Sequence, residues 1–468
     1  MGSRTRGGPR LSPAFVDTLG GEVTEMRKIR DLLAPDNESG MTMAEVIVAL
    51  MVFTIIALGM SVSLLSMTKL VSDDRNREVA AGLASQEIDR LRAVTDPFSV
   101  HTKATQIVTV GNVTYTVDRE VNWESTTGAS ANCGSGGGIL QYKHVNVDVS
   151  WPGQLSLQTP VEADTILAPA TRINDPSLGT ILVSVLGADG TGRSGVGVTV
   201  TPTSGGAAVG AVVATDVDGC TYVLKVTPGT YKVQISNAGY IDYNQVASPS
   251  LSLLVTAGAA QTANFAYDQQ GTFNLKYANA YAGASTLPTT LTTNFVSSKG
   301  SYPTASKATP ILLYPLAEGY AAIAGNMTSC LSVDPLNWAA SKVSGVNMSA
   351  GVRPQTGVAP GGSGTLNVPM GVVAVTVPAL ATSFSITNTA APSGTGDPGC
   401  ATPATYNYTF ATAPATGSVV YLAVPFGSYT VSSVNAAGAK TAMSSGFALS
   451  TQGELTASVI TFDPRVAG

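Results

Sequence analysis

The chain has 468 residues and a net charge of -5, with 12% charged residues, 49 glycines and 26 prolines. This length is enough for about three domains, and the low charge density with many small and β-branched residues favours short strands over helix bundles. No basic run is concentrated enough to indicate a nucleic-acid partner, and two histidines with four cysteines leave little material for a metal centre.

The first 40 residues are interpreted as a cytoplasmic leader. Arg27, Lys28 and Arg30 precede an apolar run, as is typical of the cytoplasmic flank of a membrane helix. Our hypothesis is that translation starts at Met26, because the leader is then short and basic. An intact-mass measurement that finds residues 1–25 in the uncleaved precursor would exclude this start.

Residues 38–45 (Glu-Ser-Gly-Met-Thr-Met-Ala-Glu) lead directly into an apolar stretch, about residues 46–67. A helix rises about 1.5 Å per residue, so this stretch spans roughly the 30 Å of a bilayer core. It is too long for the apolar region of an ordinary signal peptide. A carboxylate at the edge of such a helix is costly in lipid unless it is paired, so Glu45 is a candidate functional residue.

The sequence Gly40-Met41 with Glu45 resembles the processing signal of type IV prepilins and pseudopilins. The resemblance covers about 55 residues after Gly40, with methionine in place of the commoner phenylalanine. It implies that a prepilin peptidase cuts after Gly40 and that the new amino terminus at Met41 is N-methylated. It also implies that Glu45 meets the terminal amine of a neighbouring subunit during assembly. A plain uncleaved signal anchor, which would need neither Gly40 nor Glu45, is the competing interpretation.

The apolar helix is predicted to continue into water, because no proline interrupts residues 41–96 and Pro97 ends it. Apolar residues recur at three- and four-residue spacing from Ala80 to Val94, which predicts one face packed on a sheet. Over residues 97–172, alternating runs predict a small antiparallel sheet. The predicted strands are 106–110, 113–117, 145–151 and 161–166. One long helix on such a sheet is similar to the head of a pilin.

Residues 173–269 are typical of an all-β module. The strands expected there are 181–185, 196–200, 211–214, 222–226 and 228–233. A Gly-Val-x-Val strand, the turn Thr215-Asp-Val-Asp-Gly219 and the strand Pro228-Gly-Thr-Tyr-Lys-Val233 resemble carboxypeptidase regulatory-like or Cna-B-like domains. This resemblance implies an immunoglobulin- or transthyretin-like sandwich that acts as a spacer or binding module, without a catalytic centre.

The segment Pro425-Phe-Gly-Ser-Tyr-Thr-Val431 repeats the proline–tyrosine–valine strand of the first module with one extra residue. The repeat predicts a second β-sandwich over residues 364–468, with a connecting β region over residues 270–363.

All four cysteines follow the apolar helix, on the side that a prepilin would export, where disulfides are permitted. Cys330 and Cys400 are predicted to be bridged, because the distal half contains no other cysteine. Cys133 and Cys220 remain as a possible pair, although they fall in different predicted modules.

Catalytic and metal chemistry finds little support in the sequence. His101 and His144 lie outside any HExxH arrangement, which argues against a zinc peptidase. The segment Asp216-Val-Asp-Gly219 lacks the downstream acids of an EF-hand and is interpreted as a turn. We therefore expect no enzyme activity, no cofactor and no metal.

These observations predict an α+β region followed by all-β modules: a long transmembrane helix packed on a small antiparallel sheet, then two β-sandwiches. The predicted function is that of a structural or adhesive minor subunit of a type IV pilus-like filament. Its expected partners are prepilin peptidase, other pilin subunits, the assembly platform, the membrane and an unknown surface ligand, with no nucleic acid bound by the distal modules. The expected location is the membrane before assembly and the cell surface afterwards. The alternatives are a pseudopilin of a type II secretion or DNA-uptake machine, or an uncleaved membrane-anchored surface binding protein.

Overall fold

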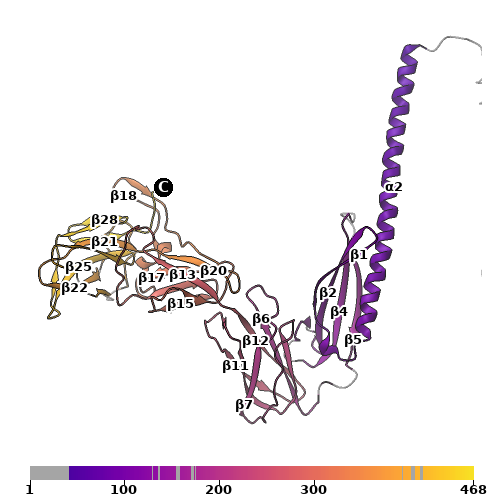
Figure 1. Cartoon of the computed structure of the whole chain (residues 1–468), viewed down its shortest axis with the longest axis horizontal. Helices are drawn as coiled ribbons and strands as arrows, with labels where there is room; N and C mark the ends of the chain where they lie inside the picture. The colour runs from indigo at the N-terminus through magenta and orange to yellow at the C-terminus, as the bar shows by residue number, and fades with distance from the viewer. Residues whose placement is uncertain are drawn as a thin grey trace, which may run out of the picture. The chain divides into compact units, whose positions relative to one another are not determined.

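The computed structural model describes residues 42–467, and Figure 1 shows its elements in chain order. The residues left undescribed within this range are 129, 135–137, 154–158, 170–172, 174, 390, 393, 402–405 and 412–414. One long apolar helix is followed by a largely all-β chain, as the sequence predicts. The chain divides into two units, Met1–Arg77 and Glu78–Gly468.

Helix α2 (Met43–Arg92) is built from residues with no internal proline. It ends at Arg92, so the predicted continuation to Asp96 is wrong. Asp96 precedes a proline and has extended backbone, and its side chain accepts the Phe98 N–H to cap the short helix η1 (Pro97–Ser99). A residue before proline disfavours helical backbone, which accounts for the extended backbone of Asp96.

A five-stranded antiparallel sheet follows the helix, in the order β1-β2-β4-β5, with β3 paired to β2. Its strands are β1 (Lys103–Val110), β2 (Val113–Ser125), β3 (Ser130–Ala131), β4 (Leu140–Ser150) and β5 (Val161–Leu167). Side chains of β2 and β4 alternate between buried and accessible positions. One buried cluster combines Ala80, Ala84, Ile88 and Leu91 of α2 with residues of these strands such as Val147. The helical spacing in the sequence therefore marked a buried face.

The first β-sandwich has two sheets, β10-β12-β6-β8 and β11-β9-β7. Its strands are β6 (Gly179–Leu186), β7 (Gly197–Ser204), β8 (Cys220–Val226), β9 (Gly229–Ser236), β10 (Tyr240–Asp242), β11 (Ser250–Val255) and β12 (Ala260–Gln269). The first strand β6 and the last strand β12 pair in parallel. The predicted strand at residues 211–214 is wrong. Val213 is 78% exposed and its carbonyl accepts the Thr221 hydroxyl, so a side chain rather than a strand ladder holds this segment.

The region after the first sandwich is itself layered, with sheets β16-β13-β20 and β15-β14-β17 and the hairpin β18-β19. Its elements are β13 (Gly271–Tyr277), β14 (Thr293–Ser297), β15 (Gly300–Thr304), β16 (Ile311–Leu313), β17 (Ala321–Ala324), η2 (Leu331–Val333), η3 (Pro335–Asn337), β18 (Ser341–Val343), β19 (Val346–Met348) and β20 (Ser363–Val368). Strand β20 pairs in parallel with β13, so residues 363–368 belong to this region's sheet rather than opening the last sandwich.

The last sandwich is formed by the sheets β24-β21-β27 and β23-β22-β25-β29-β28, with β26 paired to β25. Its strands are β21 (Gly371–Thr376), β22 (Ala381–Asn388), β23 (Asn407–Phe410), β24 (Val419–Val424), β25 (Gly427–Asn435), β26 (Lys440–Ala442), β27 (Phe447–Leu449), β28 (Gly453–Thr456) and β29 (Val459–Phe462). A buried cluster including Phe384, Tyr429 and Phe462 fills the space between the sheets.

Candidate functional site

The start of α2 is closed by a reciprocal pair of side chains. The Glu45 carboxylate accepts the Thr42 backbone N–H and the Thr42 hydroxyl, both at 3.1 Å. The Thr42 hydroxyl in turn accepts the Glu45 N–H at 3.4 Å. This is a capping box, with Thr42 as the N-cap and Glu45 at the third helical position. Sequence reasoning missed this role, although the Thr-x-x-Glu spacing encodes it.

The predicted processing site adjoins this capping box. Gly40 and Met41 lie outside the described residues, so cleavage and methylation stay predictions. Glu45 is exposed, and its carboxylate is bonded to the residue that follows Met41. Cleavage after Gly40 would therefore create a terminal amine one residue from the group that Glu45 already contacts.

Among the described residues, α2 is the one helix long and apolar enough to cross a membrane. Its large apolar side chains from Met43 to Val71 are exposed, for example Phe53 at 69%. Three hydroxyls in this stretch bond to carbonyls four residues earlier at 2.5–2.9 Å: Thr54 to Leu50, Ser61 to Ala57 and Ser66 to Val62. Because these hydroxyls are satisfied within the helix, they add little cost in a lipid environment.

A second cluster of ionisable groups lies where the β1–β5 sheet meets the first sandwich. The Nδ1 atom of His101 is 3.3 Å from Asp216 Oδ2 and 3.7 Å from Asp218 Oδ2. The side chain of Asp218 is only 7% exposed, and its Oδ2 accepts the Thr102 N–H at 2.9 Å. The segment 216–219 does form a turn, but sequence reasoning did not bring His101 to it, because the two lie far apart in the chain.

Lys143 lies near this cluster and is buried. Its Nζ donates to the Val100 carbonyl at 2.6 Å and lies 5.2 Å from the centre of the Trp123 ring. Burial lowers the pKa of Lys143 to about 8, while the charges of Asp216 and Asp218 act in the opposite direction.

The same junction is held by a disulfide and by aromatic packing. The disulfide Cys133–Cys220 joins the loop between β3 and β4 to the start of β8. The Trp123 indole N–H donates to the Tyr222 hydroxyl at 3.0 Å. A small core with residues from both sides surrounds this bond: Trp123, Leu140, Ile173, Leu182 and Ala260. The second disulfide joins Cys330 to Cys400 in the distal half.

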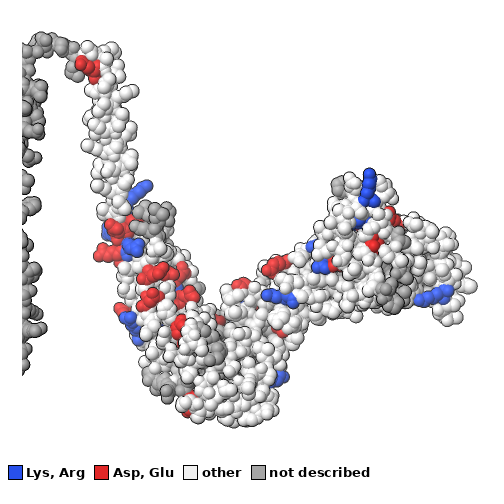
Figure 2. Space-filling view, turned by 180° about the vertical axis from the view of Figure 1, so that it is seen from behind, with Lys and Arg blue, Asp and Glu red and all other residues white. Residues whose placement is uncertain are grey.

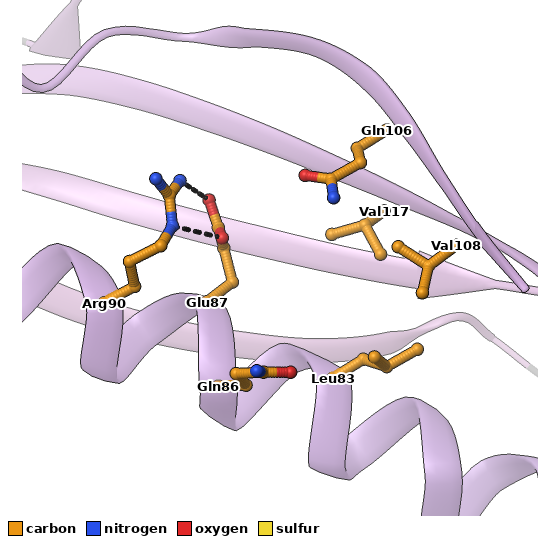
Figure 3. Close-up of a pocket in the computed structure, with 7 residues that line it drawn as sticks. All are labelled: Leu83, Gln86, Glu87, Arg90, Gln106, Val108 and Val117. Atoms are coloured by element: carbon orange, nitrogen blue, oxygen red, sulfur yellow. Dashed lines mark hydrogen bonds and ion pairs between the residues drawn. The ribbon is translucent and has the colours of Figure 1, made fainter. Parts of the chain in front are cut away.

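A cleft of about 330 Å³ lies between α2 and strands β1 and β2 (Figure 3). Leu83, Val108 and Val117 supply apolar lining, and Glu87 and Arg90, both on α2, are paired side by side. The Glu87 carboxylate accepts two hydrogen bonds from Arg90, at 2.5 and 2.9 Å, and is 2.9 Å from Arg119 Nη1. These pairs neutralise Glu87, so the cleft offers no free carboxylate from this residue for chemistry.

Acidic side chains gather over the helix-and-sheet region, as the space-filling view shows (Figure 2). Asp118, Asp148 and Glu162 stand directly opposite one another across β2, β4 and β5. Burial raises the pKa of Asp148, and the neighbouring carboxylates, with Glu162 first among them, raise it further. This face of the sheet is therefore electrostatically strained at neutral pH.

No family model and no curated protein matches this chain. Among solved structures, the TIE protein of Bacillus anthracis aligns at 13% identity and TM-score 0.19, covering 73% of this chain and 70% of that one. A streptococcal ancillary pilin aligns at 11% identity and TM-score 0.18, covering 48% of this chain and 75% of that one. BcpA, the major pilin subunit of Bacillus cereus, aligns at 9% identity and TM-score 0.17, covering 61% of this chain and 95% of that one. TM-scores this low do not establish a common fold with these proteins.

Proposed function

We propose that this chain is a minor, low-copy subunit of a type IV pilus-like filament, processed after Gly40 and assembled through α2. The observation that carries the proposal is the position of Glu45 at the start of an exposed apolar helix. The next charged residue is Lys69, so the stretch between them is suited to lipid or to other apolar helices.

The contacts of Glu45 explain why a positive partner is needed. Its described bonds to Thr42 come from a peptide N–H and a hydroxyl, which satisfy the oxygen but leave the negative charge unpaired. Moving an unpaired carboxylate into an apolar environment is costly. The methylated amine of Met41 on a neighbouring subunit would supply the charge, and pairing there would fix the register of one subunit against the next.

The β modules support display rather than shaft building. More than 350 residues follow α2, and in a shaft of many closely packed copies so large a head would crowd its neighbours. We propose that these modules present or bind an unidentified surface ligand and that the chain has no enzymatic activity. Prepilin peptidase, other pilin subunits and the assembly platform are its proposed partners, and the cell surface is its proposed location.

The test is the mature amino terminus, measured by mass spectrometry on membrane and sheared surface fractions. Cells with an active prepilin peptidase should yield a methylated peptide that begins at Met41. Matched cells without the peptidase should retain the leader. An intact leader in both strains would reject processing and leave a membrane-anchored β-module protein.

Two substitutions of Glu45 separate charge pairing from helix capping. Glu45→Gln keeps an oxygen that can complete the capping box but loses the charge, whereas Glu45→Ala loses both. If the charge pairs with an amine, both variants should be cleaved normally but recovered in sheared filaments at less than about a tenth of the wild-type level. Wild-type incorporation of Glu45→Gln, with loss only in Glu45→Ala, would show that capping alone matters.

A further inference from the structure

We propose that His101, Asp216 and Asp218 bind one divalent transition-metal ion of the Zn²⁺ class. The site lies at the junction between the β1–β5 sheet and the first sandwich. It is independent of the pilin proposal, and it replaces the expectation from sequence that the chain holds no metal. An imidazole nitrogen and carboxylate oxygens form a donor set that such ions accept, whereas Ca²⁺ takes six to eight oxygen ligands.

The two measured distances from His101 Nδ1 to the carboxylate oxygens are close to those around a tetrahedral ion. Metal–nitrogen and metal–oxygen bonds of about 2.0–2.2 Å at tetrahedral angles place ligand atoms about 3.3–3.6 Å apart. The Nδ1 atom of His101 lies 3.3 Å from Asp216 Oδ2 and 3.7 Å from Asp218 Oδ2. One ligand atom from each of the three residues lies within 4.8 Å of the other two. Three protein ligands would leave a fourth position for water.

The state of His101 is the second observation that points to a ligand. The His101 side chain is 26% exposed, but its Nδ1 atom is shielded from solvent and makes no hydrogen bond among the described residues. Nδ1 lies at ion-pair distance from the two carboxylates, so it faces negative charge unless a proton or a cation lies between them. A buried polar atom without a partner is costly. A cation between Nδ1 and the two Oδ2 atoms would use its lone pair and would also relieve the repulsion between the carboxylates.

The carboxylates are already oriented by other bonds. Asp216 Oδ1 accepts the N–H groups of Asp218 at 3.0 Å and Cys220 at 2.8 Å, which leaves its Oδ2 facing His101. The Thr102 N–H fixes Asp218 Oδ2 at 2.9 Å. Bonds of this kind orient metal ligands and strengthen binding. The disulfide of Cys220 to Cys133 further holds the turn against the sheet.

The nearby ammonium of Lys143 does not fill the position between the three groups. It donates to the Val100 carbonyl and lies over the Trp123 ring, so its direct contacts are with those groups. An ion at the proposed site would therefore add a further link across the junction, from the segment before β1 to the turn before β8.

The chain offers a matched control for this site. His144 is the other histidine, and it also lies near a carboxylate, with Nε2 3.4 Å from Asp164 Oδ1. That pair is exposed, at 42% and 56%, and the described residues place no third ligand beside it. His101→Ala and His144→Ala therefore remove the same side chain from a three-ligand and a two-ligand setting.

The experiment uses the full chain in detergent, stripped with EDTA and then dialysed against Zn²⁺ at micromolar concentrations. The wild type and His144→Ala should each bind one ion per chain, and His101→Ala should bind at least about tenfold more weakly. Zn²⁺ should raise the midpoint of thermal unfolding in the first two proteins but not in the third. In EDTA, His101→Ala should unfold at the wild-type temperature, which separates loss of the site from loss of the fold.

The proposal is overturned if the wild type fails to bind one equivalent of Zn²⁺. It is also overturned if His101→Ala and His144→Ala respond alike. Asp218→Asn provides a second check because it removes one ligand charge while keeping the volume and an oxygen for the Thr102 N–H. It should weaken Zn²⁺ binding as well, and unchanged binding would contradict the assignment of Asp218.

Discussion

The first and last sandwiches share one local device. In each, a proline-containing turn carries the chain from one sheet to the other, from β8 to β9 and from β24 to β25. A buried tyrosine follows the turn and bonds back to it: the Tyr231 hydroxyl donates to the Thr227 carbonyl at 2.7 Å, and the Tyr429 hydroxyl donates to the Phe426 carbonyl at 3.0 Å. The sequence repeat therefore encodes a turn that takes the chain from one sheet of the sandwich to the other.

The two sandwiches differ in how they are tied to their surroundings. The first is joined to the preceding sheet by Cys133–Cys220 and aromatic packing. The last is closed by Arg465, which is 1% exposed, pairs with Asp463 through Nη2 at 2.7 Å and lies over the Trp338 ring. The comparison shows that the turn inside each sandwich is determined by residues close together in the sequence. The attachment of each sandwich to its surroundings depends on residues distant in the sequence.

Arg465 should give the largest effect on stability. Arg465→Met leaves Asp463 buried without its ionic partner, and we expect a loss of about 3–5 kcal/mol in the unfolding free energy. Denaturant unfolding of the full chain in detergent, followed by tryptophan fluorescence, measures this loss because Trp338 lies beside Arg465. The double variant Arg465→Met/Asp463→Asn should recover part of it. A loss below about 1 kcal/mol in the single variant would mean that Arg465 does not anchor the last sandwich.

Removing the two disulfides one at a time compares the disulfide at the first junction with the disulfide in the distal half. Replacing either cysteine pair by alanine should cost about 2–5 kcal/mol, because each disulfide restricts the unfolded chain. The sequence separations of 87 and 70 residues are close, so chain entropy alone predicts losses that agree within about 0.3 kcal/mol. A much larger loss for Cys133 and Cys220 would show that this disulfide also maintains the junction, and calorimetry of both variants would measure the difference.

Removing the tyrosine hydroxyl that bonds to this turn should lower the unfolding free energy by similar, smaller amounts in the two sandwiches. Tyr231→Phe and Tyr429→Phe each remove a hydroxyl that serves a backbone carbonyl in a buried setting, and each should cost about 1–2 kcal/mol. Urea titration of the two variants compares them directly. If only one variant is destabilised, the turn is not the same device in both sandwiches.

The acidic residues on the β1–β5 sheet should give the smallest effect. Asp148→Asn removes the central charge between Asp118 and Glu162, so it should stabilise the chain at pH 7 by about 0.5 kcal/mol. The pKa of Asp148 is raised in the folded protein, so folding takes up protons near that pKa and the charge penalty disappears in acid. The gain should therefore vanish below about pH 3.5, where the carboxyl is protonated in both states. A destabilising effect at pH 7 would contradict the repulsion.

Much of the architecture was predictable because its signals are local. The apolar run, the buried helical face from Ala80 to Leu91 and the proline–tyrosine turns all follow from spacing within a few residues. Errors arose where distant partners decide the outcome. Strand β20 belongs with β13 because the two pair across a long insertion, and residues 211–214 have strand-like composition without a strand ladder.

The two candidate sites also differ in how far apart their residues lie in the sequence. Thr42 and Glu45 are three residues apart, so their capping box could be anticipated from the sequence. His101 meets Asp216 and Asp218 only after the sheet and the first sandwich are packed together. Nothing in the sequence around His101, or around the turn that contains Asp216 and Asp218, indicates that these residues lie close together.

The parallel pairing of terminal strands has a mechanical consequence. In the first sandwich β6 and β12 are parallel neighbours, and in the following region β13 and β20 are. Tension on the two ends of such a module pulls these strands in opposite directions along their length. The ladder between them is then loaded in shear, with its hydrogen bonds sharing the force, instead of being peeled open one bond at a time. A chain built from modules of this kind can transmit a pulling force from one end to the other while its cores stay folded.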